Sequence, residues 1–257
     1  MNNSVSVVYY VDKLSNFNPF FFGQIGYKKV LQEQEFVIQE PVEKYINTIC
    51  GIEVEIIIGV KTSLSVSDEN KWIYEIADKV FTIGDNVLNA DAYNMLFRNC
   101  SNDFVCLLKS HFFTEANWLQ ELIFFQKNIQ KSGVVGISSS FLSCEFTPML
   151  SANQENMIGV FLPKDEAMEV AGAYLFDKQL LYFVGAFDNN PAIDNYEFLQ
   201  WQMRCTRMGF HNFYIPTQSC IQISVEKIYV TDKLIEVNNS VEEMRKNRNF
   251  YIPLDTF

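Results

Sequence analysis

Two carboxylates stand close together in the second half of the chain, where a polar stretch leads into a helix-like pattern. Asp194 and Glu197 are separated by two residues, and the pattern that follows predicts a helix over residues 196–208. Carboxylates are common general bases in enzymes. A structural interpretation is also open, in which Asp194 caps this helix and Glu197 stabilises its first turn through the helix dipole.

The histidine, cysteine and tryptophan residues give little support to other kinds of catalytic or binding site. A Ser–His or Cys–His pair would have to use His111 or His211, because the sequence has only two histidines. His211 lies in a short polar stretch typical of a surface turn. Cys106 lies within an apolar run, where a thiol is expected to be buried and inert, and the helical spacing around Trp201 favours core packing over stacking on a sugar. The sequence also lacks a dinucleotide fingerprint, a P-loop and a G-x-S-x-G elbow.

The apolar pattern predicts the elements that position these groups. Strands are expected at residues 4–10, 54–60, 80–83, 104–108, 134–137, 157–162, 171–176, 213–215 and 220–224. Helices are expected at 41–49, 72–77, 90–99 after an Asn89 cap, 115–131 between Thr114 and Gly133, 196–208 before Gly209, and 241–249. Strands that alternate with helices predict an α/β protein whose largely parallel sheet carries helices on both faces.

Composition narrows the class of partner. Forty-eight per cent of the residues are hydrophobic and 20% are charged, which excludes a largely disordered chain. The net charge of −11 argues against a nucleic-acid partner. The first residues do not resemble a secretory signal, and no apolar run is long enough to be a transmembrane segment, so we expect a cytoplasmic protein. The six cysteines have no C-x-x-C pair and are expected to be reduced core residues.

Several short motifs follow one another in a characteristic order. They are Gly84-Asp85-Asn86, the stretch from Ala90 to Asn94, the stretch from Asp103 to Leu108 with Lys109-Ser110-His111 and Trp118-Leu119 after it, Gly172-Ala173, Gly185-Ala186-Phe187-Asp188, and the stretch from Asp194 to Phe198 followed by Arg204 and Gly209. This order resembles the inverting glycosyltransferases of family two, over roughly residues 4–223. The resemblance implies a GT-A fold, a Rossmann-like α/β fold of nucleotide-sugar transferases with a mixed, mainly parallel sheet.

The resemblance also implies how the chain is divided into functional regions. It implies one GT-A-like domain over residues 1–257, with a nucleotide-binding half (1–110), an acceptor-side half (111–224) and a C-terminal extension (225–257). The donor would be a nucleotide sugar and the acceptor a glycan, lipid or protein. The residues implied to bind the nucleotide sugar are Ser63, Asn86, Asn94, Lys109 and Asp188.

Four positions depart from the family pattern. Val60 stands at the start of a turn that is Asp-rich in the family, and Gln222 stands where a late histidine is common. Lys109-Ser110-His111 replaces the metal-binding D-x-D motif. His111 would suit Mn²⁺ better than Mg²⁺, which prefers oxygen ligands; alternatively Lys109 counters the phosphate charge, or the loop binds no metal. Asn195 replaces the usual base, so that role would pass to Asp194 or Glu197.

Two functions therefore remain open at the level of the sequence. In the first, the chain is a glycosyltransferase with altered catalytic motifs. In the second, it has lost catalysis and binds or scaffolds a partner glycosyltransferase. The four departures favour the second function, and the resemblance as a whole favours the first.

Overall fold

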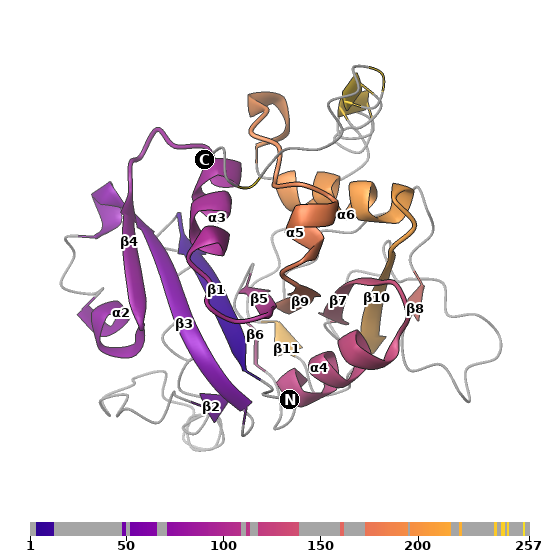
Figure 1. Cartoon of the computed structure of the whole chain (residues 1–257). Helices are drawn as coiled ribbons and strands as arrows, with labels where there is room; N and C mark the ends of the chain where they lie inside the picture. Colours follow the sequence, from indigo (N-terminus) through magenta and orange to yellow (C-terminus); the bar gives the residue numbers. More distant parts are fainter. Residues whose placement is uncertain are drawn as a thin grey trace.

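The sheet is the framework of the molecule (Figure 1). The computed structural model describes residues 4–12, 48–49, 52–65, 71–108, 112–113, 118–138, 160–161, 173–194, 196–216 and 221–222, with residues 239, 240, 243, 244, 246 and 254 near the C-terminus. The strands are β1 (Val5–Val11), β2 (Thr48–Ile49), β3 (Ile52–Lys61), β4 (Lys79–Ile83), β5 (Phe104–Leu108), β6 (Phe112–Phe113), β7 (Ser132–Ser138), β8 (Val160–Phe161), β9 (Ala173–Asp177), β10 (His211–Pro216) and β11 (Ile221–Gln222). The helices are α2 (Lys71–Ile76), α3 (Asn89–Arg98), α4 (Trp118–Asn128), α5 (Leu180–Phe183) and α6 (Glu197–Arg207), with 3₁₀ turns η4 (Thr62–Leu64) and η8 (Pro191–Ile193).

Nine of the described strands form one mixed sheet. Its order is β4-β3-β1-β5-β9-β7-β10-β8, with β2 also paired to β3, and β6 and β11 form a separate two-stranded ribbon. The pairings β4–β3, β3–β1, β1–β5 and β7–β10 are parallel. The strand β9 is antiparallel to both its neighbours, and β2 and β8 are antiparallel to theirs. The expected mainly parallel α/β sheet is confirmed.

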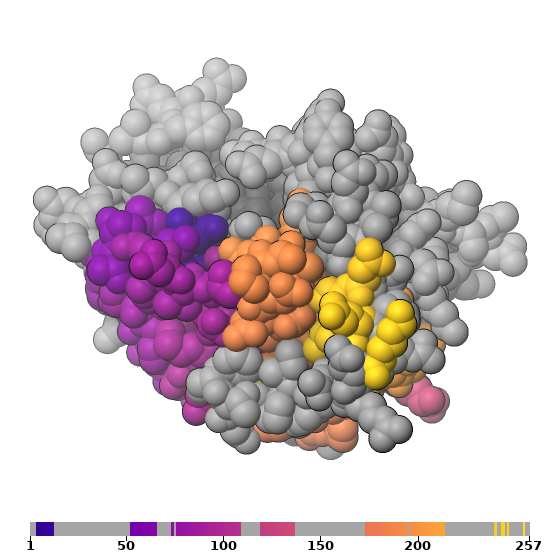
Figure 2. Space-filling view, turned by 90° about the horizontal axis from the view of Figure 1, so that it is seen from above, coloured from indigo at the N-terminus to yellow at the C-terminus, as the bar shows by residue number. Residues whose placement is uncertain are grey.

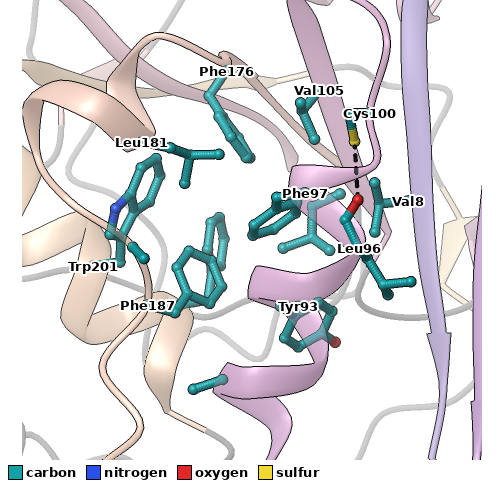
Figure 3. Packing of buried hydrophobic residues seen from close by; sticks show 14 of the residues in the cluster. Val8, Tyr93, Leu96, Phe97, Cys100, Val105, Phe176, Leu181, Phe187 and Trp201 are labelled. Atoms are coloured by element: carbon teal, nitrogen blue, oxygen red, sulfur yellow. Dashed lines mark hydrogen bonds between the residues drawn. The ribbon is translucent and has the colours of Figure 1, made fainter. Parts of the chain in front are cut away.

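Helices cover both faces of the sheet, as the sequence predicts. Because side chains alternate along a strand, β1 supplies Tyr9 to one face and Tyr10 to the other. The first face packs against α2 and α4, and the second packs against α3, α5 and α6. On the second face, aromatic rings of α3, β9, α6 and the loop before it meet, with Phe97 and Phe187 5.1 Å apart between centroids (Figure 3). Trp201 belongs to this core and is fully buried, as expected.

The amino ends of the parallel strands hold a compact polar cluster around Glu55. Its Oε1 lies 2.6 Å from Lys79 Nζ and accepts a hydrogen bond from Ser101 Oγ at 2.8 Å. Its Oε2 accepts hydrogen bonds from Ser6 Oγ at 2.5 Å and from Ser101 N at 2.8 Å. Burial would raise the pKa of Glu55, but the bonds from Lys79, Ser6 and Ser101 outweigh it and lower this pKa to about 2. This cluster ties β1, β3, β4 and the start of β5 together.

Three predictions of helix ends were wrong. Asn89 does not cap α3, because it is already the first helical residue and Leu88 is the N-cap, without a side-chain hydrogen bond. The helix α4 ends at Asn128, and Lys131 takes the left-handed conformation (φ 54°), whereas Gly133 lies inside β7. Residues 48–49, predicted as the end of a helix, are the strand β2 because they pair with β3.

Other expectations fit, or fall outside the described residues. Gly209 follows α6 with φ 88°, as a helix-terminating glycine should. Cys100, Cys106 and Cys205 are free and buried, and burial raises the pKa of each thiol, to about 12 for Cys100. Thr114, residues 41–47 and the other three cysteines lie outside the described residues. The division into a nucleotide-binding half, an acceptor-side half and a C-terminal extension stays a prediction.

Candidate functional site

The carboxyl ends of the parallel strands β1, β3 and β4 lie on one side of the sheet, where open α/β sheets bind their ligands. Asp12 follows β1, Ser63 lies in the turn after β3, and Asp85 follows β4. The chain then turns back into α3, so the amino terminus of this helix faces the same side (Figure 1). We call this region the carboxyl end of the sheet.

Ser63 and Asp85 are bound to each other. Asp85 Oδ1 accepts hydrogen bonds from the Ser63 side chain at 2.7 Å and from the Ser63 backbone N–H at 3.1 Å. These two bonds, with a contribution from the charge of Lys61, lower the pKa of Asp85. Asn86 is exposed beside them. The predicted ligand-binding residue Ser63 is therefore fixed by a carboxylate that the sequence prediction did not include.

Asp194 caps a helix, but not the one that follows it. Its Oδ1 accepts a hydrogen bond at 3.0 Å from the backbone N–H of Asn89, the first residue of α3. The following helix α6 has Tyr196 as its N-cap, without a side-chain hydrogen bond. The structural interpretation of Asp194 from the sequence was therefore wrong in its target, because tertiary packing brings a distant helix to this carboxylate. The bond joins the two halves of the chain.

The backbone of residues 184–187 is held by side chains from two helices. Four consecutive carbonyl groups accept hydrogen bonds: Val184 from Arg204 Nη1, Gly185 from Trp201 Nε1, Ala186 from Arg204 Nη2, and Phe187 from Asn94 Nδ2. Phe187 N–H in turn donates to Asn94 Oδ1 at 2.9 Å. Both polar atoms of the predicted ligand-binding residue Asn94 are thus used to fix this loop. Burial lowers the pKa of Arg204 to about 10.

This clamped loop ends at Asp188, which is half-buried. Asp188 Oδ2 accepts hydrogen bonds from Gln200 Nε2 at 3.1 Å and from Ser240 Oγ at 3.3 Å. Burial raises the pKa of Asp188, while the positive charge of Arg204 acts in the opposite direction. Glu197 lies in the first turn of α6 and is fully buried.

Tyr10 is a candidate residue that the sequence motifs gave no reason to select. It is 4% exposed, and its hydroxyl oxygen has no hydrogen-bond partner among the described residues. Burial raises the pKa of Tyr10, and the charges of Asp12, Asp194, Asp85 and Glu197 raise it further, in that order. Four carboxylates, three of them far from Tyr10 in the sequence, thus raise the pKa of this hydroxyl group.

The residues predicted to bind the phosphate or a metal ion lie outside the described part of the chain. Lys109, His111 and Asn195 lie outside the described residues, and Gln222 is described only as part of β11. Within the described ranges, no group of three His, Cys, Asp or Glu side chains is arranged to hold a metal ion. His211 is not in a surface turn: it is the first residue of β10 and is half-buried, with its ring near that of Phe213.

Segments that lie far apart in the sequence meet on the side of the molecule that carries these groups. Figure 2 views the molecule from above and shows residues of the first half (purple) directly beside those of the α5–α6 region (orange). None of the helices in the described part is both long and apolar enough to cross a membrane.

Comparison with known proteins identifies the fold. No family model and no curated protein matches the sequence. Among solved structures, residues 1–349 of S. aureus TarS in complex with UDP-GlcNAc match with a TM-score of 0.56 and 11% identity over 94% of this chain and 65% of that chain. A longer S. aureus TarS structure matches with a TM-score of 0.52 and 13% identity, over 93% of this chain and 39% of that one. The mannosyltransferase PcManGT from Pyrobaculum calidifontis, in complex with GDP-Man and Mn²⁺, has a TM-score of 0.49 and 13% identity, over 96% of this chain and 64% of its own.

The chain has the GT-A fold of glycosyltransferases. It spans less than two-thirds of each of these three structures. At these identities the similarity establishes the architecture, and the chemistry has to be argued from the residues of this chain.

Proposed function

We propose that this protein is a glycosyltransferase that moves a sugar from a nucleotide-sugar donor to a glycan, lipid or protein acceptor. The observation that carries the proposal is the position of three carboxylates at the carboxyl end of a GT-A sheet: Asp12 follows β1, Asp85 follows β4, and Asp194 binds the first residue of α3. TarS structures with this fold hold UDP and UDP-GlcNAc. Carboxylates accept hydrogen bonds from the many hydroxyl groups that a sugar and a ribose present.

Asp194 is the better placed of the two predicted bases. In the transfer step, an acceptor hydroxyl oxygen bonds to the anomeric carbon as the bond from that carbon to the nucleoside diphosphate breaks, and the hydroxyl proton passes to a carboxylate. Glu197 has no exposed surface, so an acceptor would not reach it without rearrangement. Asp194 is only partly buried, and the hydrogen bond from Asn89 uses only its Oδ1.

The clamped loop would place Asp188 beside the acceptor. Because four of its carbonyl groups are fixed by side chains of α3 and α6, the loop holds the backbone before Asp188 against α3, the helix whose first residue binds Asp194. A rigid support of this kind helps to keep reacting groups in a productive arrangement. The motif Gly185-Ala186-Phe187-Asp188, which predicted Asp188 as a binding residue, therefore also fixes the conformation of this loop.

The departing nucleoside diphosphate needs a positive partner, which a divalent cation such as Mn²⁺ or Mg²⁺ would supply. The described residues do not form such a site. In our proposal His111 binds the cation, or Lys109 itself counters the phosphate charge.

The alternative function is a catalytically inactive partner of another glycosyltransferase. It is favoured by the fact that Ser63, Asn94 and Asp194 all bind other parts of this chain. The replacements at Lys109 and Asn195 point the same way. The cytoplasmic location is also part of the proposal.

Nucleotide binding and turnover distinguish the two functions. Thermal unfolding would be followed with UDP, GDP and CDP, each with and without Mn²⁺, and release of nucleoside diphosphate from UDP-GlcNAc and GDP-mannose would be measured alongside. A nucleotide at 100 times its dissociation constant should stabilise the protein by about 2.7 kcal/mol. Stabilisation with turnover supports the transferase, stabilisation without turnover with any acceptor class supports the inactive partner, and no stabilisation by any nucleotide contradicts the transferase.

A further inference from the structure

The hydroxyl group of Tyr10 is buried but forms no hydrogen bond with the described residues, whereas most buried polar groups in proteins are paired. A buried hydroxyl without a partner costs free energy, so native proteins rarely keep one without a reason. Tyr10 is 4% exposed, and its hydroxyl oxygen finds no hydrogen-bonding partner among the described residues. A phenylalanine would fill the same space in the core without this cost.

The ring of Tyr10 is held in place by its neighbours. Tyr10 lies one residue before the end of β1, opposite Gly59 in the parallel β3. A Cβ atom at Gly59 would lie 3.1 Å from Tyr10 Cδ2 and closer still to Ile83 Cδ1 and Leu96 Cδ1, so the glycine allows these side chains to pack closely against the strand. On α3, Tyr93 packs edge-on against the ring, with the centroids 5.6 Å apart.

The surroundings of the hydroxyl are acidic and lie at the ligand-binding end of the sheet. Asp12 is two residues away, Asp85 follows β4, which lies beyond β3 in the sheet, and Asp194 is bonded to the first residue of α3. The charges of these three carboxylates and of Glu197 all act on the hydroxyl. A phosphate group would be repelled by such surroundings, whereas a sugar hydroxyl can donate to a carboxylate and also bond with a phenol.

We propose that the Tyr10 hydroxyl binds a hydroxyl group of the nucleotide sugar, either on the ribose or on the transferred sugar. This inference rests on the proposed function and adds a specific donor-binding residue to it. The hydroxyl has no exposed surface in the free protein, so the ligand displaces a side chain in front of it.

The test is a pair of substitutions that each remove one hydroxyl group. Tyr10→Phe removes the unpaired hydroxyl, and Tyr9→Phe makes the same change one residue earlier, on the opposite face of β1. Dissociation constants for UDP, GDP, CDP, UDP-GlcNAc and GDP-mannose would be measured for both variants and for the wild type by calorimetry. Melting temperatures would be measured in parallel.

We expect Tyr10→Phe to weaken binding of the preferred nucleotide sugar about five- to tenfold, the usual effect of losing one hydrogen bond. Its melting temperature should stay the same or rise, because an unpaired buried group has been removed. Tyr9→Phe should leave the affinity unchanged. Equal weakening for the nucleotide and its sugar conjugate assigns the ribose, whereas weakening for the conjugate alone assigns the transferred sugar.

Two results would overturn the inference alone. The first is that the wild type binds a nucleotide or nucleotide sugar and Tyr10→Phe binds it with the same affinity. The second is that Tyr10→Phe and Tyr9→Phe both weaken binding and both lower the melting temperature, which would mean that the tyrosine hydroxyls have a structural role. If the wild type binds none of the five compounds, the proposed function and this inference fail together.

Discussion

The two ends of the parallel strands differ in how completely their buried polar groups are paired. At the amino end, Glu55 accepts hydrogen bonds from Ser6 and Ser101 and pairs with Lys79, and its pKa falls to about 2. At the carboxyl end, Asp85 and Asp194 also accept hydrogen bonds from this chain, but the buried hydroxyl of Tyr10 has no partner among the described residues.

The difference separates polar groups that serve the fold from those available to a ligand. A cluster whose members satisfy one another stabilises the native state and offers little to a ligand. Like charges and an unpaired hydroxyl cost stability, and proteins commonly retain such costs at functional sites. The following predictions test whether this contrast holds.

Substitution of Asp194 should have the largest effect on function. Asp194→Asn keeps an oxygen that can accept the hydrogen bond from Asn89 but removes the base, so turnover should fall roughly 100-fold or more. Asp194→Ala should lose turnover equally and also lose the cap of α3, at a cost of about 1 kcal/mol. Release of nucleoside diphosphate and urea unfolding measure the two effects. Full turnover in Asp194→Asn would remove Asp194 as the base.

Asn94 should be an exception at the carboxyl end, because it is a structural residue there. Asn94→Ala leaves the N–H and C=O groups of Phe187 without their partners inside the core, at a cost of about 2–4 kcal/mol. Asn99→Ala, at the end of the same helix, removes one less buried bond to Met95 and should cost less than about 1 kcal/mol. Urea unfolding would compare the two. Equal losses would mean that the clamp on the loop contributes little.

Glu55 should affect stability and leave ligand binding unchanged. Glu55→Gln keeps the shape of the side chain and removes its charge beside Lys79, which should cost about 1–2 kcal/mol at pH 7 once solvent screening of this partly exposed pair is included. Glu53→Gln, two residues earlier and exposed on the same strand, is the control and should change little. A change in nucleotide affinity in Glu55→Gln would contradict the contrast between the two ends.

The same carboxylate predicts part of the acid sensitivity. The pKa of Glu55 is lower in the folded protein than its ordinary value of 4.5, so its contribution is complete above that pH. As the pH falls from about 4.5 to about 2, the folded state loses this contribution. Urea unfolding of the wild type and Glu55→Gln across this range should show the difference between the two shrinking as the pH falls. A constant difference would disprove the assignment.

Ser63 should have the smallest effect. Ser63→Ala removes one of the two hydrogen bonds to Asp85, so the pKa of Asp85 should rise toward its ordinary value. The melting temperature should not change measurably, because this pair is exposed to solvent. An NMR titration of the Asp85 carboxyl group measures the shift, and an unchanged pKa would show that the backbone bond alone holds it.

The sequence determined the elements and the class of fold. Strands such as β3 and β5 are buried on both faces, so their apolar runs are continuous and easily predicted. Amphipathic spacing and Gly209 likewise marked α6 and its end. The order of motifs identified Asp188 and Asp194 as candidate residues, and Asp194 lies at the carboxyl end of the sheet, where it binds the first residue of α3.

Only the tertiary structure decided what each polar side chain contacts. Asp194 caps α3 instead of α6. Its partner Asn89 is 105 residues away in the sequence, so no local sequence pattern could predict this hydrogen bond. Asn94 holds the loop at Phe187 for the same reason. The unpaired hydroxyl of Tyr10 could not be recognised in an apolar strand, because a hydrogen bond that is missing depends on everything that surrounds the group in space.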